Sequence, residues 1–411
     1  MTNKKRNSEL AFNDADRVIL DENGDYYFQI DALKAVMIFL VIFDHIVYWD
    51  IKNLIGAALW ERISIPIFLV IMGFNMGKSF KRRGADTLKQ LYSKEYFKKK
   101  VVRYIVPFLI LYGVSTLFGL IWYKFDVSAM YQQQLGPSNG IMNLFIGILP
   151  FWGPGNWFIP VILQSILLVP LLYKGFTKKP VLTLILCFIV EIVMQLTVFF
   201  FIGDLFPGGV ISWPKVHILN MFMTSTFFYL SAIGLGMWFS LDHDLQSNRN
   251  LFMWFLFPIS LSYIIAYQFF GFQYMIGDVP LIRGDYHLLV FPYSAFLFLL
   301  ALRYLPKKAN NRFSRAISYI GKSTYHILLI QIFGYGMIYA VFGTHYSIVS
   351  KFVPIDILNL IVVWVMFIPF GVWWYKIDRG KVLWRRVVFT VIMFMSFILV
   401  SVLFLWIGSV T

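Results

Sequence analysis

Two ionisable side chains that could do chemistry lie on the first apolar run of the chain, residues 30–49. Lys34 and His45 are eleven residues apart. Because a helix turns about 100° and rises about 1.5 Å per residue, we expect these side chains within about 20° of each other and about 16 Å apart along one face. An ionisable group at the centre of a membrane-spanning helix costs at least ~2.5 kcal/mol, so the pair predicts a functional site.

The neighbours of this pair leave other roles open. Lys34 could extend its ammonium to the membrane surface, and His45 could be a hydrogen-bonded core residue. Asp31 is placed one turn before Lys34, where it can pair with that ammonium. Asp44 precedes His45 directly, and consecutive residues point about 100° apart on a helix. We therefore expect no contact from Asp44 that orients the imidazole.

A second group of cations precedes the apolar run 104–123. Lys100 and Arg103 are three residues apart and would share one helix face at the membrane surface, where Lys and Arg bind phosphate well. Contact with anionic lipids or a solvated topology signal would also account for them. With Lys34 they would form a basic mouth leading to His45. A long anionic ligand with a phosphate head and a narrow tail, such as coenzyme A, fits this geometry.

Polar residues in later apolar runs could line a path to the same site. Asn156 and Gln164 are eight residues apart and share a helix face. Trp157 between them could instead be an ordinary interfacial aromatic residue. The candidates for this path are Asn156, Trp157, Gln164, Tyr325 and Gln331.

Glu191 is the one carboxyl group deep in the run 181–202. It could relay a proton or contact substrate, or it could be a protonated glutamic acid bonded to its neighbours. It is the second catalytic candidate after His45.

No pattern in the sequence supports a metal or a tightly bound cofactor. His217, His243, His287 and His345 have no metal-ligand spacing, and the sequence lacks an HExxH motif, a glycine-rich phosphate loop and a CxxC pair. The single cysteine, Cys187, lies in an apolar run, which excludes a disulfide framework. We therefore expect no metal and no permanently bound cofactor.

The composition is that of an integral membrane protein. Of the 411 residues, 59% are hydrophobic and only 14% are charged, whereas soluble domains have about 25% charged residues. The net charge of +15 reflects Lys and Arg in short loops between apolar runs, a pattern typical of topology signals and lipid contact. We expect membrane lipids among the partners and no nucleic acid.

Eleven apolar runs are long enough to span a bilayer. They predict an all-α bundle of about 10–11 transmembrane helices. The runs are 30–49, 59–77, 104–123, 156–173, 181–202, 216–239, 251–272, 287–304, 318–342, 355–375 and 388–409. A shorter apolar stretch, Ile141–Trp152, predicts a re-entrant or interfacial segment.

The distribution of Lys and Arg predicts the orientation in the membrane. Counted over the loops, 28 lie on one side and 6 on the other, which places the N-terminus in the cytoplasm and the protein in the cytoplasmic membrane. Residues 1–29 are then a polar cytoplasmic segment, and we expect no cleavable signal peptide. The main transmembrane domain is expected over 30–375, and a basic loop with an additional helix over 376–411.

Five segments in register resemble the acyltransferase-3 family of polytopic membrane acyltransferases, and the resemblance extends over about residues 28–375. The segments are Ile30–His45 with its Lys-x10-His spacing, Ile67–Phe74, Lys100–Arg103 followed by Pro107, Asn156–Gln164, and Gly321–Tyr325. The sequence departs from the family pattern at Met72, where Ser is usual, and at Gln331, where many members have His. An eleventh span also exceeds the usual ten.

The resemblance implies transfer of an acyl group, usually acetyl, from cytoplasmic acyl-CoA to a hydroxyl or amine of a carbohydrate or glycoconjugate. Lys34, Lys100 and Arg103 would hold the phosphates of the acyl-CoA. His45 would act as a general base on the acceptor or form a transient acyl-imidazole.

A transporter of a saccharide or lipid-linked saccharide is the alternative, because bundles with buried charge also suit transport. Against it, the sequence shows no inverted repeat of broken helices. A purely structural role is disfavoured, because buried charge is costly to keep without a task.

Overall fold

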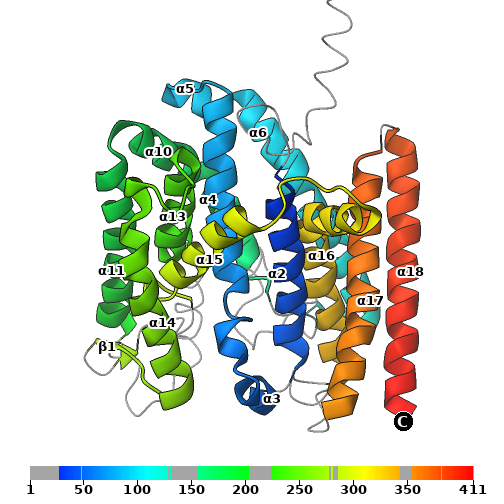
Figure 1. Ribbon diagram of the computed structural model, residues 1–411. Coiled ribbons are helices and arrows are strands. Elements are labelled where there is room, and N and C mark those ends of the chain that lie inside the picture. The colour runs from blue at the N-terminus through cyan, green and yellow to red at the C-terminus, as the bar shows by residue number, and fades with distance from the viewer. Residues whose placement is uncertain are drawn as a thin grey trace, which may run out of the picture.

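The computed structural model describes residues 27–47, 49–127, 130, 155–202, 224–276, 279–280, 286–342, 353–380 and 382–410. Over these residues the chain forms long helices that run side by side (Figure 1). The exception is a small hairpin in which β1 (Met275–Ile276) pairs antiparallel with β2 (Val279–Pro280). The prediction of an all-α protein is confirmed.

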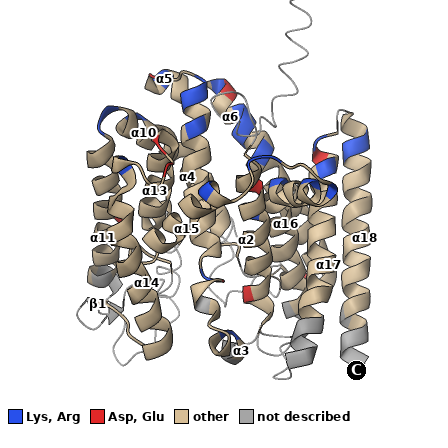
Figure 2. Cartoon of the chain, viewed as in Figure 1, with Lys and Arg blue, Asp and Glu red and all other residues tan. Residues whose placement is uncertain are grey.

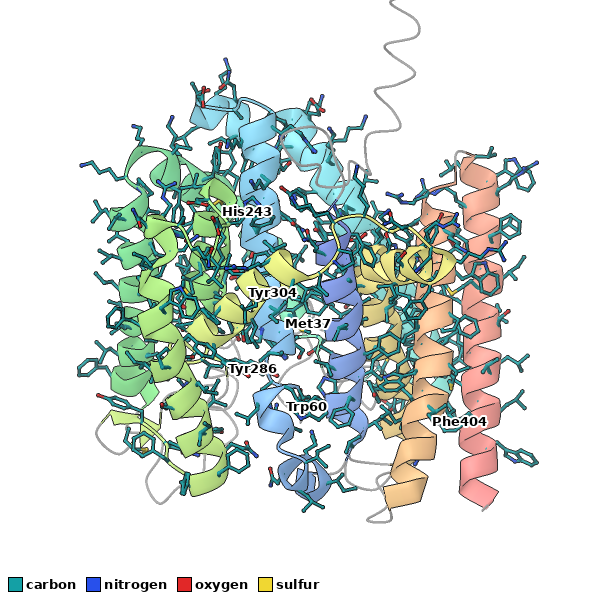
Figure 3. The ribbon with its side chains drawn as sticks, viewed as in Figure 1. Met37, Trp60, His243, Tyr286, Tyr304 and Phe404 are labelled. Carbon is teal, nitrogen blue, oxygen red and sulfur yellow. The ribbon has the colours of Figure 1, made fainter. Side chains whose placement is uncertain are left out.

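Six helical segments in the described part of the chain are long and apolar enough to cross a membrane. They are Leu88–Trp122, α10 (Phe158–Lys178), α11 (Pro180–Ile202), α14 (Phe252–Phe270), α17 (Val353–Asp378) and α18 (Leu383–Val410). Side chains project outward from α11 at one edge and from α18 at the other (Figure 3). Large apolar residues such as Val193 on α11 and Met395 on α18 are exposed there, as lipid contact requires. The chain is a multi-pass membrane protein.

Five further helices form much of the interior of the bundle. They are α2 (Phe28–Ile46), α4 (Ser64–Arg82), α13 (Leu230–Leu241), α15 (Phe291–Tyr304) and α16 (Arg312–Phe342). α4 packs along α13, and α2 packs along α16. Small residues permit both contacts: a Cβ on Gly73 would overlap the carbonyl oxygen of Ile233, and one on Gly321 would overlap that of Asp31. The close approach of α16 fixes the position of α2.

The ends of the helices differ from the predicted runs at two places that matter for the site. The first run stops at Ile46, because Val47 is extended (φ −80°, ψ 133°). The second run begins as a helix only at Ser64. Short elements fill these boundaries and the basic loop: α3 (Trp49–Leu54), η2 (Ala57–Leu59), α5 (Leu88–Leu91), α6 (Lys94–Lys100) and the π-helical turn η3 (Val101–Ile105) ahead of α7 (Val106–Trp122).

Short 3₁₀ turns lie at the starts of two other helices. The 3₁₀ turns η6 (Thr226–Tyr229) and η7 (Asn248–Asn250) precede α13 and α14. The predicted segment Ile141–Trp152 and the first part of the run 216–239 lie outside the described residues.

The Lys and Arg residues gather at one end of the bundle, which includes α5 and α6 and is the upper end in Figure 2. α3 marks the opposite end (Figure 1). The asymmetry counted from the loops is therefore also an asymmetry in space, and we call these ends the basic end and the α3 end.

Candidate active site

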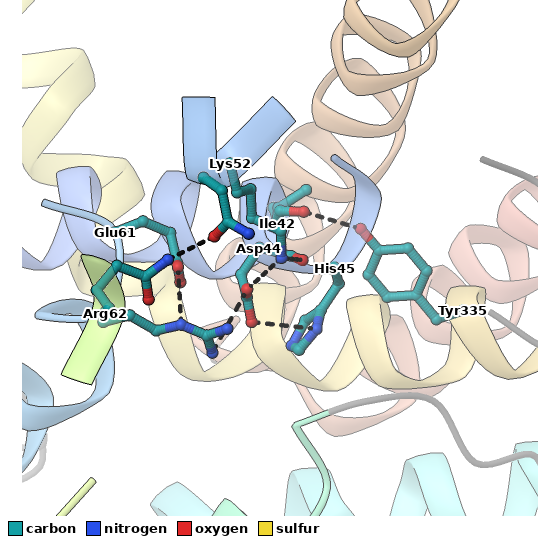
Figure 4. Close-up of polar contacts among 9 residues, drawn as sticks. Ile42, Asp44, His45, Lys52, Glu61, Arg62 and Tyr335 are labelled. Carbon is teal, nitrogen blue, oxygen red and sulfur yellow. Dashed lines mark hydrogen bonds and ion pairs between the residues drawn. The ribbon is translucent and has the colours of Figure 1, made fainter. Parts of the chain in front are cut away.

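His45 lies in the last turn of α2, toward the α3 end of the bundle. Its side chain is 18% exposed. The ring meets Tyr335 of α16 edge-on, with 5.9 Å between ring centroids. The Tyr335 hydroxyl donates to the carbonyl oxygen of Ile42 at 3.1 Å, so α16 holds the end of α2 that carries the imidazole (Figure 4).

Asp44 lies beside the imidazole, contrary to the expectation from its position on the helix. Its Oδ2 is 3.6 Å from His45 Nδ1, an ion-pair distance rather than a hydrogen bond (Figure 4). The expectation was wrong because the 100° rule describes how side chains leave the helix, not where their ends lie. Here two cations from the next segment hold the other carboxylate oxygen.

Those cations belong to a buried charge cluster that the sequence did not reveal as a unit. Lys52 Nζ donates to Asp44 Oδ1 and to the Asp44 carbonyl oxygen, both at 2.6 Å. Arg62 Nη1 lies 3.6 Å from Asp44 Oδ1, and its Nε lies 3.3 Å from Glu61 Oε2. Two carboxylates thus balance two cations, which lets all four groups stay charged with little exposure. The sequence feature that could have predicted this cluster is a set of oppositely charged residues at positions 44, 52, 61 and 62, on both sides of a helix end.

The other side of His45 faces Gly155, directly before α10. A Cβ placed on Gly155 would stand 4.0 Å from His45 Nε2, 3.9 Å from Gln331 Nε2 and 3.5 Å from Leu328 Cδ1. Gly155 has φ +93°, which residues with a side chain rarely adopt. Glycine therefore leaves a small space open between the imidazole and the amide.

Two buried amides border this turn. Gln331 is 0% exposed and Asn156 is 1% exposed. Within the described residues, no amide atom of either side chain has a hydrogen-bond partner. Buried amides normally find partners, so a polar ligand is a natural complement for this pair.

The other two residues predicted for the path near α10 have different surroundings. Trp157 stacks on Tyr229 with a centroid distance of 5.4 Å and lies beside other aromatic rings. Gln164 uses both ends of its amide: Nε2 donates to the Thr224 carbonyl at 3.1 Å, and Oε1 accepts from Thr226 N–H at 2.9 Å. The structure places Gln331 and Gly155, which directly precedes Asn156, near His45. Gln164 instead fastens the start of η6 to α10.

At the basic end, Lys34 pairs with Asp31 as expected, with Nζ 2.7 Å from Oδ1. The Ser318 hydroxyl of α16 donates to the other Asp31 oxygen at 3.0 Å. Arg103 and Lys322 lie near enough for their positive charges to act on Lys34. Lys34 and Arg103, two of the three residues predicted to bind acyl-CoA, therefore lie in the same region of the basic end.

Lys100 and Arg103 lie on α6 and η3, next to this point. Lys100 Nζ lies 5.5 Å from the Tyr96 ring and 5.6 Å from the Tyr104 ring, and the Arg103 guanidinium lies 5.5 Å from the same Tyr104 ring. Cation–π contact stabilises these cations without neutralising them. In the described part of the chain neither forms an ion pair with a carboxylate, which leaves their charge available to an anion.

Tyr325, predicted for the substrate path, contacts the segment that carries Lys100 and Arg103. Its hydroxyl donates to the carbonyl oxygen of Tyr104 at 2.8 Å, inside the π-helical turn. Such turns interrupt the regular helical ladder and are frequent at functional sites. Tyr325 therefore fastens the turn that carries Arg103 to α16.

Glu191 lies in a different part of the bundle. It is 0% exposed on α11, and its Oε2 accepts from the Ser231 hydroxyl and from the Ser231 N–H at 3.3 Å. α13 packs between α11 and α4, and α4 packs on α2. Glu191 is thus hydrogen-bonded in the α11–α13 contact and is not part of the His45 site.

Comparison with known proteins settles the family. Neither the curated proteins nor the solved structures include a match to this chain. A family model described as an acyltransferase domain matches residues 27–406. This range contains α2, the basic residues Lys100 and Arg103, and most of α18. The chain belongs to the acyltransferase-3 family and is a membrane acyltransferase.

Proposed function

We propose that this acyltransferase moves an acyl group, in the simplest case acetyl, from cytoplasmic acyl-CoA to a hydroxyl or amine of a carbohydrate or glycoconjugate. The proposal rests on the arrangement of the side chains around His45. The imidazole of His45 lies between the carboxylate of Asp44 and the space that Gly155 leaves open. A hydroxyl is a weak nucleophile, and a base beside a space for the reacting groups is what its acylation requires.

Asp44 determines how the ring can act. A carboxylate near Nδ1 favours the tautomer with its proton on Nδ1, which leaves the lone pair of Nε2 toward Gly155. Nε2 can then accept the proton of the acceptor hydroxyl as its oxygen attacks the thioester carbonyl. The proton passes afterwards to the departing CoA sulfur, which returns the ring to its starting state.

The basic cluster of Lys34, Lys100 and Arg103 supplies positive charge for the phosphates of the donor. Lys34 and His45 are separated by eleven residues of one helix, or about 16 Å, a distance that a pantetheine arm can cover. The positive-inside rule favours the basic end as the cytoplasmic end, where acyl-CoA is found. The acceptor would then approach from the α3 end, and its class follows from the family resemblance.

The test is transfer of label by purified protein in lipid nanodiscs. Acetyl-CoA labelled in the acetyl group is supplied with a membrane extract containing glycolipids and lipid-linked saccharides. We expect label in a saccharide-containing product, and loss of that transfer in a folded His45→Gln variant. Movement of saccharide across vesicles without any transfer of label would overturn the proposal in favour of a transporter.

A further inference from the structure

The roles proposed for His45 and Asp44 leave the buried amide of Gln331 without an assigned role. Gln331, in the middle of α16, is 0% exposed, and neither atom of its amide has a hydrogen-bond partner among the described residues. An amide in this position destabilises the folded state relative to an apolar side chain of the same shape. Such a group is expected where a bound molecule completes its hydrogen bonds.

The position of this amide connects it with the reaction. Its nitrogen and His45 Nε2 both lie within 4.0 Å of the point where a Cβ of residue 155 would be. Residue 155 is glycine with φ +93° and has no Cβ at that point, and among the described residues the nearest atom, Leu328 Cδ1, is 3.5 Å away. The base and the amide therefore border one small space from different helices, and Leu328 forms an apolar part of its wall.

We propose that the Gln331 amide N–H donates to the carbonyl oxygen of the acyl thioester and stabilises the negative charge that develops on it. This inference rests on the proposed function and gives the site a second group that touches the reacting atoms. A donor that is fixed before the reaction in a water-poor space is an effective way to stabilise an oxyanion. Burial of Gln331 on a long helix provides that fixed position.

The acceptor oxygen forms a bond to the thioester carbon as His45 Nε2 takes the hydroxyl proton. The electron pair of the C=O bond moves onto the carbonyl oxygen, where the Gln331 N–H donates. The pair then returns, the C–S bond breaks, and the CoA sulfur takes the proton from Nε2. The products are the acylated acceptor and free CoA thiol.

The test compares two buried glutamines by the same substitution. Gln331→Met keeps the length of the side chain and removes the donor. We expect kcat for CoA release from acetyl-CoA to fall about 10²–10³-fold, while KM for acetyl-CoA is unchanged. The temperature of unfolding should stay the same or rise, because an unpartnered amide is replaced by an apolar group.

Gln29→Met is the matched control. Gln29 is 1% exposed, but its Nε2 donates to the carbonyl oxygens of Leu302 at 2.7 Å and Leu305 at 2.9 Å. This variant should unfold at a lower temperature and keep kcat per folded molecule. Gln331→His restores a donor at the site and should recover part of the rate lost in Gln331→Met.

Each outcome has a distinct meaning. An undiminished kcat in Gln331→Met, or a loss of stability like that of Gln29→Met, overturns the role of Gln331 and leaves the proposed function standing. Absence of CoA release by the unaltered protein, with acetyl-CoA and the membrane extract, overturns the proposed function and this inference with it.

Discussion

The two carboxylate oxygens of Asp44 have different partners, and this difference suits Asp44 to act on the imidazole of His45. Lys52 and Arg62 both contact Oδ1, which leaves Oδ2 for the side of His45. A carboxylate so surrounded stays ionised, and an ionised carboxylate beside Nδ1 stabilises the imidazolium that forms as Nε2 takes a proton. In the proposed reaction, Asp44 is therefore a positioning residue for His45.

Asp44→Asn tests this role. Asparagine keeps an oxygen for Lys52 but loses the charge, so we expect kcat to fall about 10²–10⁴-fold, the range typical for impaired acid–base catalysis, with little change in KM for acyl-CoA. Steady-state kinetics with labelled acetyl-CoA measure both values. Asp31→Asn is the control on the same helix: Asp31 pairs with Lys34, so its loss should change KM and not kcat. Equal kcat in Asp44→Asn and the unaltered protein would refute the role.

Single-sequence reasoning could identify residues that face each other along one helix, and it failed where contact depends on other segments. Lys34 and Asp31 are one turn apart, and their 2.7 Å pair follows from helical geometry. The contact of Asp44 with His45 depends on Lys52 and Arg62, which reach it only because the helix ends at Ile46. Helical spacing contains no information about that arrangement.

Among the helical elements, the π-helical turn η3 carries Arg103 of the proposed donor site. The charge of Arg103 acts on Lys34, although the two residues are far apart in sequence. The existence of an apolar run over 104–123 could be predicted from hydropathy. The turn could not, because it is stabilised from outside by the Tyr325 hydroxyl on α16. The prediction of Tyr325 as a path residue contained no sign that its hydroxyl would bond the backbone of this turn.

Lys100→Ala and Arg103→Ala should weaken acyl-CoA binding more than any other property. A hydrogen bond to a charged group contributes about 1.5–3 kcal/mol, so the Kd for a non-transferable acyl-CoA analogue should rise about 10–100-fold for each. Calorimetric titration measures this value. Lys99→Ala is the neighbouring control, because Lys99 is 43% exposed and pairs with Glu95 at 2.7 Å. An unchanged Kd in both test variants would leave the cluster as a topology signal only.

Tyr325→Phe tests the support of the π-helical turn. Loss of one buried hydrogen bond should lower the free energy of unfolding by about 1 kcal/mol. Because Arg103 lies on the turn that loses its anchor, Kd for the acyl-CoA analogue should rise as well, while kcat at saturating donor is preserved. Thermal unfolding and the same titration give both values. A fall in stability with unchanged Kd would separate the turn from donor binding.

Over the whole molecule, the two ends of the bundle differ in charge and in chemistry. Lys and Arg gather at the basic end, and the imidazole of His45 lies toward the α3 end (Figures 1 and 2).

The family match over 27–406 includes most of α18, beyond the residues covered by the motif resemblance. α18 is joined to the bundle through Asp378, which lies 3.2 Å from Arg386 Nη2 and 2.9 Å from His326 Nε2. The charge asymmetry could be predicted from the sequence, because the Lys and Arg residues of the loops can be counted without a structure. The Asp378 contacts could not be predicted, because they join residues of three different helices.

The orientation of these ends is open to direct measurement, because the chain has a single cysteine and it is buried. Lys99→Cys puts a thiol at the basic end, and Leu54→Cys puts one on α3, where Leu54 is 84% exposed. In right-side-out vesicles, a membrane-impermeant maleimide should label Leu54→Cys and spare Lys99→Cys, and inverted vesicles should give the reverse. The unaltered protein, with only Cys187, provides the background. Labelling of Lys99→Cys in right-side-out vesicles would place the basic cluster away from the cytoplasm. Cytoplasmic acyl-CoA could then not reach it, and the proposed donor site would have to be abandoned.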